Sequence, residues 1–254
     1  MGIRIVVKGA DFSERAVSYI PAVEDGLEYL NFFGGSADNL RRNLAKGKPD
    51  ALLVGAPVVK AHSAVFTNLV NYLKTAVDHT PSMSIVLVLK TPATEDDAMY
   101  VSNFGSQRKG APAGTTTLGT TTWFRGLGPV DGKGKLGQIV SYVEGATNPA
   151  VEPLEIDVPT NTIRMMASSF HTPTRQAKFV DKTAGYSDSR TLPVDRTFDL
   201  GQTFNIGSTV GPYAPSTTAE IYFAALYSRQ LSDAELDAVY QSLKAYYTHR
   251  GIVI

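Results

Sequence analysis

The feature that most constrains the fold lies near the C-terminal end of the sequence, where an apolar segment leads directly into a well-marked helix. Residues Ala219–Ser228 carry apolar side chains at odd and even positions alike. A strand with one face in water would alternate apolar and polar residues, so this segment is predicted to lie between two layers. A chain that contains such a strand must cover both faces of the sheet that holds it.

The start of the following helix is marked by its capping residues. Ser232 and Glu235 have the spacing of a capping box, in which each side chain accepts a hydrogen bond from the backbone amide of the other residue. Leu231 and Leu236 occupy the two staple positions on either side of this box. Apolar residues then continue at helical spacing as far as Tyr247. The sequence therefore predicts a buried strand followed by a capped helix.

This C-terminal unit resembles the closing motif of the laminin-G-like branch of the concanavalin A-like lectin and glucanase superfamily. In that branch a central strand ends in a Tyr-x-Arg-x-Leu-Ser-x-x-Glu step into a short helix, which matches Tyr227–Glu235 here. The resemblance covers residues 204–245 and implies a fold that is all-β with a few helices, a two-sheet antiparallel jelly-roll sandwich. It implies little about chemistry, because one fold carries many functions.

After residue 82 the sequence has the spacing of strands and turns that is typical of a β-sandwich: short apolar segments are separated by turns rich in Gly, Pro, Asp and Ser. The expected strands are Met83–Leu89, Met99–Phe104, Gly119–Phe124, Leu136–Val143, Thr162–Phe170, Gln176–Asp181, Arg196–Leu200 and Phe204–Gly207. Three stretches between them are predicted to be long loops, which often carry function: Gln107–Thr117, Gly126–Lys135 and Thr183–Pro193.

The N-terminal third is expected to flank this sandwich. Short strands are predicted at Ile3–Val7, Gly26–Asn31 and Ala51–Pro57. A helix at about residues 63–77, capped by Ser63, is predicted from apolar residues that recur at helical spacing. Because no linker or internal repeat interrupts the chain, we predict a single concanavalin A-like domain over residues 1–254, in which residues 1–80 are the part that contains this helix.

Charge and hydropathy exclude several classes of partner. The 24 basic and 24 acidic side chains cancel, whereas a nucleic-acid-binding surface needs a basic excess. No segment approaches the roughly 20 apolar residues of a membrane span. The apolar run near the N-terminus is too short for the core of a signal peptide, so we expect a protein made in the cytoplasm without a leader. The absence of cysteine excludes disulfides and thiolate metal sites.

One short segment resembles a catalytic strand. Leu154–Pro159 begins like the Glu-Ile-Asp-x-x-Glu strand of the glucanases in this superfamily, with Glu155 and Asp157 in place. A proline and a threonine occupy the region where the second glutamate should be, and retaining hydrolysis needs two carboxylates about 5 Å apart. Prolines flank the segment and predict a loop. We therefore predict no catalytic residues, and a polysaccharide-degrading enzyme of the same fold remains the alternative.

No cofactor is expected from the residues themselves. The four histidines are scattered without metal-ligand spacing and are read as surface or capping residues. The family resemblance leaves calcium between loops as an alternative. The acidic residues for it would be Asp131 and the group Asp181, Asp188 and Asp195, although no EF-hand pattern is present.

Sugar binding is the function that the family resemblance implies. Its physical basis would be an aromatic ring under the apolar face of a pyranose, with polar side chains around it. The candidate ligand-binding residues are Trp123, Arg125, Tyr186 and Tyr213. Each aromatic residue also has a structural interpretation: Trp123 as part of the core, and the two tyrosines as contacts with a neighbouring subunit.

The layout of the whole chain resembles laminin-G-like proteins of tailed bacteriophages. The matching features are Val7–Ser13, the glycine pair Gly34–Gly35 with Val54–Pro57, and the expected helix before the sandwich. This resemblance implies a non-enzymatic tail-fibre or attachment protein of the virion that forms a homotrimer and binds a bacterial surface glycan. A purely structural virion protein without a ligand is the other alternative.

Overall fold

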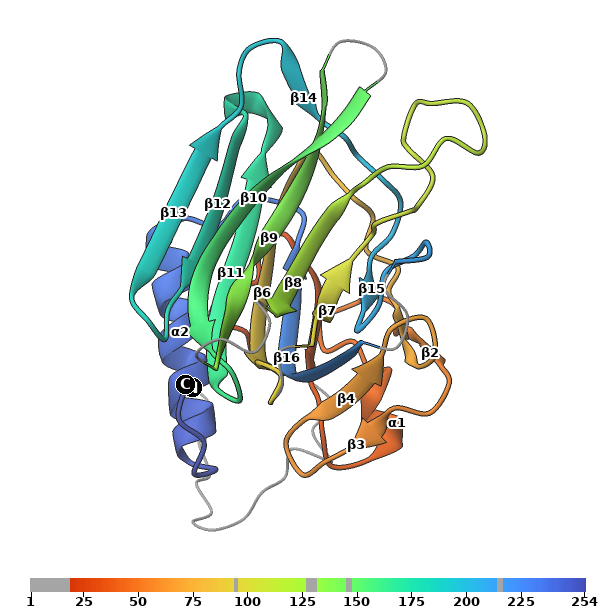
Figure 1. Cartoon of the computed structure of the whole chain (residues 1–254). Helices are drawn as coiled ribbons and strands as arrows, with labels where there is room; N and C mark the ends of the chain where they lie inside the picture. Colours follow the sequence, from red (N-terminus) through yellow and green to blue (C-terminus); the bar gives the residue numbers. More distant parts are fainter. Residues whose placement is uncertain (1–18, 94–95, 127–131, 145–147, 214–216) are drawn as a thin grey trace.

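The fold is a sandwich of two antiparallel β-sheets. The computed structural model describes residues 19–93, 96–126, 132–144, 148–213 and 217–254. Within these residues each sheet has eight strands, and the helix α2 (Asp233–Thr248) lies along the outside of one sheet (Figure 1). The predicted fold class, a two-sheet antiparallel jelly-roll sandwich with few helices, is confirmed. The strand expected at Ile3–Val7 lies outside the described residues.

The sheet beside α2, called sheet A, has the strand order β13-β12-β11-β6-β16-β4-β3, with β1 also paired to β16. Its strands are β1 (Leu27–Phe32), β3 (Val58–Val59), β4 (Ala64–Thr67), β6 (Ser82–Lys90), β11 (Ile163–His171), β12 (Gln176–Asp181), β13 (Tyr186–Thr191) and β16 (Thr218–Tyr227).

The opposite sheet, called sheet B, has the order β10-β9-β8-β7-β15-β5-β2, with β14 also paired to β9. Its strands are β2 (Leu52–Val54), β5 (Tyr72–Lys74), β7 (Ala98–Ser102), β8 (Thr120–Gly126), β9 (Lys133–Glu144), β10 (Asn148–Pro159), β14 (Arg196–Phe198) and β15 (Asn205–Ile206). Two short helices, α1 (Ala37–Leu40) and the 3₁₀ turn η2 (Thr172–Thr174), complete the described elements.

The strand β16 is buried on both faces, as its sequence predicts. Ile221, Ala224 and Leu226 belong to the core between the sheets, and Phe223 and Ala225 belong to a second core beneath α2. The pairing of β16 with β6 shifts register between Ile221 and Phe223. This bulge places Ile221 on the opposite face from Phe223, whereas strict alternation would put them together.

The capping box of α2 is confirmed. The Ser232 hydroxyl accepts a hydrogen bond from the Glu235 amide, and the Glu235 carboxylate accepts one from the Ser232 amide. At the other end of the helix, the Tyr247 hydroxyl donates to the carbonyl of Tyr222 in β16 and so ties α2 to sheet A. In the part of the chain that the structure describes, no helix has the length and apolar character needed to cross a bilayer.

The helix expected at residues 63–77 is wrong. This segment forms β4 and β5 instead, joined by a turn in which Leu69 has a φ of +61°. The seven-residue spacing of Phe66 and Leu73 fits two helical turns, but burial alternates within each strand. Ala64 and Phe66 are buried in β4 and Leu73 in β5, whereas Leu69 and Val70 at the turn are 40% and 60% exposed. Hydrogen bonds between Thr67 and Asn71 close the turn, and they decide the ambiguity in favour of strands.

Two further segments are strands where loops are expected. The segment with Pro153 and Pro159 belongs to β10, and most of Thr183–Pro193 belongs to β13. Both are the terminal strands of their sheets, and each pairs on one side only. Pro153 and Pro159 stand at positions of the same parity along β10. An edge strand tolerates proline where the missing amide would point away from its neighbour, so a proline pattern of this kind is compatible with a strand.

Candidate functional site

The outer face of sheet B differs from that of sheet A because no described helix covers it. In Figure 1 the strands β8, β9 and β10 lie at the front of the molecule, and α2 lies beside the other sheet. Phe124 and Leu154 point into the core between the sheets. Their neighbours Trp123 and Glu155 therefore project from the outer face, since side chains alternate along a strand.

Trp123 and Glu155 lie on either side of a glycine. Trp123 is opposite Gly137 of β9, and Gly137 is opposite Glu155 of β10. A Cβ atom on Gly137 would lie 2.1 Å from the carbonyl oxygen of Leu154 and 2.9 Å from the Cγ atom of Glu155. A larger residue would thus clash with the backbone of β10. The glycine makes room for the side chain of Glu155 on the outer face.

Arg125 contacts both residues from one side. Its guanidinium carbon is 5.5 Å from the centre of the Trp123 ring, and its Nη2 atom is 3.4 Å from Oε2 of Glu155. The Arg125 side chain is 44% exposed, the Glu155 side chain 11% and Trp123 only 6%. Arg125 is therefore the outermost member of this group of three, which we call the Trp123 cluster (Trp123, Arg125 and Glu155).

The Trp123 cluster contains two buried polar atoms that lack a hydrogen bond. Neither Nε1 of Trp123, a donor, nor Oε1 of Glu155, an acceptor, has a partner among the described residues. Buried polar atoms in proteins are nearly always paired, because leaving one unpaired is costly. An unpaired donor on Trp123 next to an unpaired acceptor on Glu155 is therefore unusual for a folded protein.

Tyr213 lies within electrostatic reach of this cluster. Burial raises the pKa of Tyr213, the Asp97 carboxylate raises it further, and the Arg125 guanidinium lowers it. The backbone carbonyl of Tyr213 accepts a hydrogen bond of 2.6 Å from the buried Asn68, and its ring packs 5.3 Å from that of Phe104. Tyr213 is 38% exposed, so an anchored ring remains accessible. The charge of Arg125 thus reaches Tyr213, which lies far from it in the sequence.

Tyr186, the fourth predicted residue, belongs to the other sheet. It begins β13 at the edge of sheet A, opposite Asp181, and packs against the core between the sheets. Burial is the main cause that raises the pKa of Tyr186. The Asp188 carboxylate raises this pKa further, and the Arg190 guanidinium lowers it. Its expected place in an acidic loop is wrong, because the polar sequence around it forms an exposed edge strand.

A buried histidine supports the loop that leads to Phe104. His79 is 1% exposed, and its Nδ1 accepts hydrogen bonds from the Gly201 amide and the Asn103 side chain. Both bonds leave the proton of the neutral ring on Nε2, 3.4 Å from the Thr120 hydroxyl. Burial, assisted by Lys109, lowers the pKa of His79 to about 3. The expectation of surface or capping histidines does not hold for His79, and its isolated position in the sequence gave no signal of this role.

Two of the four carboxylates considered for calcium are paired with other groups of the protein. Oδ2 of Asp181 accepts a 2.6 Å hydrogen bond from the buried Arg164, and Oδ1 accepts one from the Ala184 amide. Asp188 lies 3.7 Å from Arg190. Asp131 is outside the described residues. Across the part of the chain with described coordinates, no group of three or more His, Asp or Glu could hold a metal ion.

The Glu-Ile-Asp segment lacks the features of an acid–base pair. Asp157 shares the outer face with Glu155, and it binds Lys135 at 2.7 Å. The hydrogen bond from Lys135 holds the pKa of Asp157 below its usual value. A general acid needs a raised pKa. Sequence reasoning missed Glu155 as a member of the Trp123 cluster, although the alternation of apolar Leu154, Ile156 and Val158 with acidic residues was a visible signal of a half-exposed strand.

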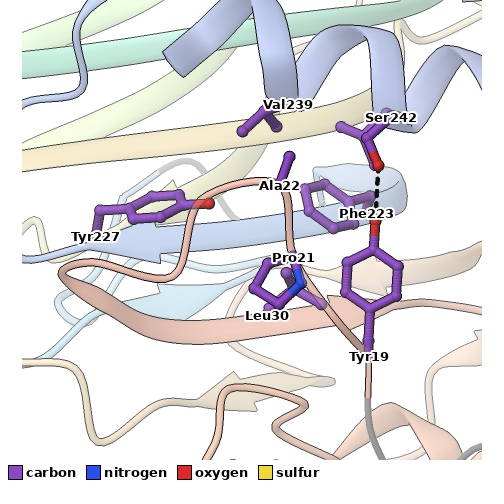
Figure 2. A pocket seen from close by; sticks show the side chains of 9 residues that line it. Tyr19, Pro21, Ala22, Leu30, Phe223, Tyr227, Val239 and Ser242 are labelled. Atoms are coloured by element: carbon purple, nitrogen blue, oxygen red, sulfur yellow. Dashed lines mark hydrogen bonds between the residues drawn. The ribbon is translucent and has the colours of Figure 1, made fainter. Parts of the chain in front are cut away.

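A small cavity on the opposite side of the molecule marks where the first described residues meet α2. Figure 2 shows Tyr19, Pro21 and Ala22 facing Val239 and Ser242 of the helix across this cavity, with the Tyr19 hydroxyl 3.0 Å from that of Ser242. Its lining is largely apolar and carries no charge. We regard it as a packing gap at the helix seam, because it offers no group that would orient a ligand.

Comparisons with known proteins identify the fold. No family model matches the chain, and neither does any curated protein. Among solved structures, the binding domain of botulinum neurotoxin serotype D matches 87% of this chain and 52% of its own, with a TM-score of 0.57 and 12% identity. The botulinum neurotoxin serotype D ligand-binding domain in complex with N-acetylneuraminic acid also matches 87% of this chain and 52% of its own, with a TM-score of 0.59 and 11% identity.

An enzyme is also among the similar structures. Trypanosoma rangeli sialidase in complex with sialic acid matches 86% of this chain and 33% of its own, with a TM-score of 0.54 and 9% identity. This chain thus spans about half the length of the toxin domains and a third of the sialidase. At these identities the likeness shows the β-sandwich fold alone, and it is shared by binding domains and by an enzyme.

Proposed function

We propose that this protein is a non-enzymatic carbohydrate-binding module whose site is the outer face of sheet B around the Trp123 cluster and Tyr213. The observation that carries the proposal is the pair of unpaired polar atoms, Nε1 of Trp123 and Oε1 of Glu155, on a face that no described helix covers. Sugars present apolar C–H faces together with hydroxyl groups. An aromatic ring flanked by a donor and an acceptor is suited to such a ligand.

The charges of the acidic residues favour binding over catalysis. Glu155 faces Arg125, and Asp157 faces Lys135. Glycoside hydrolysis needs one carboxyl group kept protonated beside one kept ionised. The pKa of Asp157 is lowered by its lysine, which is the wrong direction for the acid. The enzyme alternative predicts that Glu155→Gln abolishes sugar release from a surface polysaccharide, and the binding proposal predicts no release by either protein.

The finer part of the proposal is that this module belongs to the attachment apparatus of a bacteriophage. Its support is the resemblance of Val7–Ser13, Gly34–Gly35 and Val54–Pro57 to laminin-G-like phage proteins, whereas the helix that was also part of this resemblance is replaced by β4 and β5. On this proposal the protein is a homotrimeric tail-fibre or attachment component of the virion, assembled in the host cytoplasm, and the sugar belongs to the bacterial surface. A purely structural virion protein would instead form the oligomer without binding any glycan.

A glycan array combined with matched variants tests the carbohydrate-binding proposal. We expect the wild type to bind at least one glycan, and Trp123→Ala or Tyr213→Ala to weaken that binding about tenfold or more. Tyr186→Ala is the control, because it removes an equivalent ring from sheet A. Far-ultraviolet circular dichroism identifies any variant that fails to fold, and Trp123→Phe replaces Trp123→Ala in that case.

The oligomer and the host are tested separately. The attachment proposal expects a trimer by analytical ultracentrifugation, and added protein should block adsorption of phage to cells. An empty array, or equal binding by the sheet A and sheet B variants, would overturn the proposed site.

A further inference from the structure

Two carboxylates lie among the cations on the outer face around Trp123. Arg125 faces Glu155, and Lys135 binds Asp157 at 2.7 Å. The second lysine of β9 within reach, Lys133, also acts on Asp157 and lowers its pKa. Arg125 therefore has Glu155 beside it, whereas Lys133 and Lys135 share Asp157. An incoming anion would meet the carboxylate of Glu155 next to Arg125, and this repulsion disfavours acidic ligands.

The unpaired atoms of the Trp123 cluster also favour a ligand with neutral hydroxyl groups over an acidic one. Nε1 of Trp123 can only donate, and Oε1 of ionised Glu155 can only accept. A sugar hydroxyl both donates and accepts, so neighbouring hydroxyls can satisfy both atoms. A carboxylate accepts only, so it would leave Glu155 unpaired and place a second negative charge beside it.

Arg125 is placed to act as a movable cover over these atoms. It contacts the ring of Trp123 and the carboxylate of Glu155, and it is the most exposed of the three side chains. Its 3.4 Å contact with Glu155 is long, compared with 2.7 Å between Lys135 and Asp157. Only the arginine end of this pair is exposed, and its contact with Glu155 is long, so moving Arg125 off the ring costs less than breaking a short, fully buried pair.

From these observations we infer that the ligand of this site is a neutral pyranose with adjacent hydroxyls, rather than a sialic acid or another acidic sugar, and that it enters when Arg125 moves off Trp123. This inference rests on the proposed carbohydrate-binding function. It differs from what the sialic acid complexes of the similar structures would suggest by analogy. We expect a neutral sugar instead because the carboxylate of Glu155 lies beside Arg125.

Calorimetric titration with paired sugars tests the selectivity. The probes are methyl galactoside, methyl glucoside and N-acetylglucosamine on one side, and sialyllactose and glucuronic acid on the other. We expect the best neutral sugar to bind about tenfold or more tightly than either acidic sugar, with little change between low and high salt. Tighter binding of an acidic sugar, weakened by salt, overturns this inference alone. Failure of every sugar on a broad array overturns the proposed function as well.

Two variants test the roles of Glu155 and Arg125. Glu155→Gln removes the charge and keeps the shape, so the ratio of acidic to neutral affinity should rise about tenfold. Asp157→Asn makes the same change two residues away, and a similar rise in that variant would overturn the assignment to Glu155. Arg125→Ala removes the cover, so neutral sugars should bind several-fold more tightly. A loss of affinity in Arg125→Ala would overturn the movable cover.

Discussion

The two outer faces of the sandwich are built for opposite purposes. The outer face of sheet A is apolar, and residues such as Val86, Val88 and Ala225 are buried beneath α2. The outer face of sheet B carries the Trp123 cluster and ion pairs, with no described helix over it. The difference is already present in the strands. Strands that are apolar on both faces need a cover, and strands that are apolar on one face leave the other available for ligands.

The largest effect we expect is the loss of stability in acid that comes from the core between the sheets, where His79 packs against Phe170 and Phe204. The pKa of His79 is lowered to about 3 by burial, from 6.5 in an exposed histidine. The unfolded chain therefore binds a proton first, and stability is lost as the pH falls from about 6.5 towards 3. A shift of this size corresponds to roughly 4 to 5 kcal/mol at pH 3. Urea unfolding across this range should show the loss in the wild type.

The cap of α2, on the outside of sheet A, should lose its contribution to stability at a lower pH than His79 does. The hydrogen bond from Arg229, followed by that from the Ser232 amide, lowers the pKa of Glu235 to about 2. Its contribution is present above the ordinary value of 4.5 and is lost as the pH falls through 2. Between pH 6.5 and 4.5 the loss should thus come from His79. An equal loss in His79→Gln over this interval would contradict the assignment.

A matched pair of truncations tests whether the covered face is the one that stabilises the fold. Leu243 of α2 is 1% exposed, and Val151 on the outer face of β10 is 40% exposed. Leu243→Ala should lower the free energy of unfolding by about 3 kcal/mol, because it leaves a cavity under the helix. Val151→Ala should change it by less than about 0.5 kcal/mol. Urea denaturation measures both, and similar losses would show that the two faces contribute alike.

The smallest effect concerns the cap itself. Ser232→Ala removes the acceptor for the Glu235 amide and should cost about 1 kcal/mol of stability. Glycan affinity should stay unchanged, since α2 lies on the side away from sheet B. Thermal unfolding and the array are the two measurements. A change in affinity in this variant would mean that the two faces are coupled through the core.

Much of the fold could be predicted because local signals and burial agree. Ser232, Glu235 and the two-sided apolar segment at β16 specify the strand and its helix without reference to the rest of the chain. The prediction failed where two periods fitted the same residues, as around Phe66 and Leu73. There the decision comes from the left-handed backbone of Leu69 and from pairing with distant strands.

The candidate site could be predicted only in part, for a physical reason. Trp123 and Arg125 are close in sequence and on the same face of one strand, so alternation brings them together. Tyr213 is held by contacts with Asn68 and Phe104, which lie far away in the chain, and only the charge of Arg125 relates it to this strand. Glu155 depends on the register of β10 against β9 and on Gly137 between them. Register of this kind is a property of the folded sheet, and no local pattern records it.

The position of the chain's described ends has a consequence for how the protein meets its surroundings. Ile254 packs within the apolar cluster under α2, and Tyr19 packs against the same cluster. A group attached after Ile254 would approach from the helix side and leave sheet B pointing outward. If sheet B carries the proposed glycan site, several copies of the protein on one scaffold would present their sites in the same direction. Simultaneous contacts of these sites with a repetitive polysaccharide would then give firm attachment, even where each single site binds weakly.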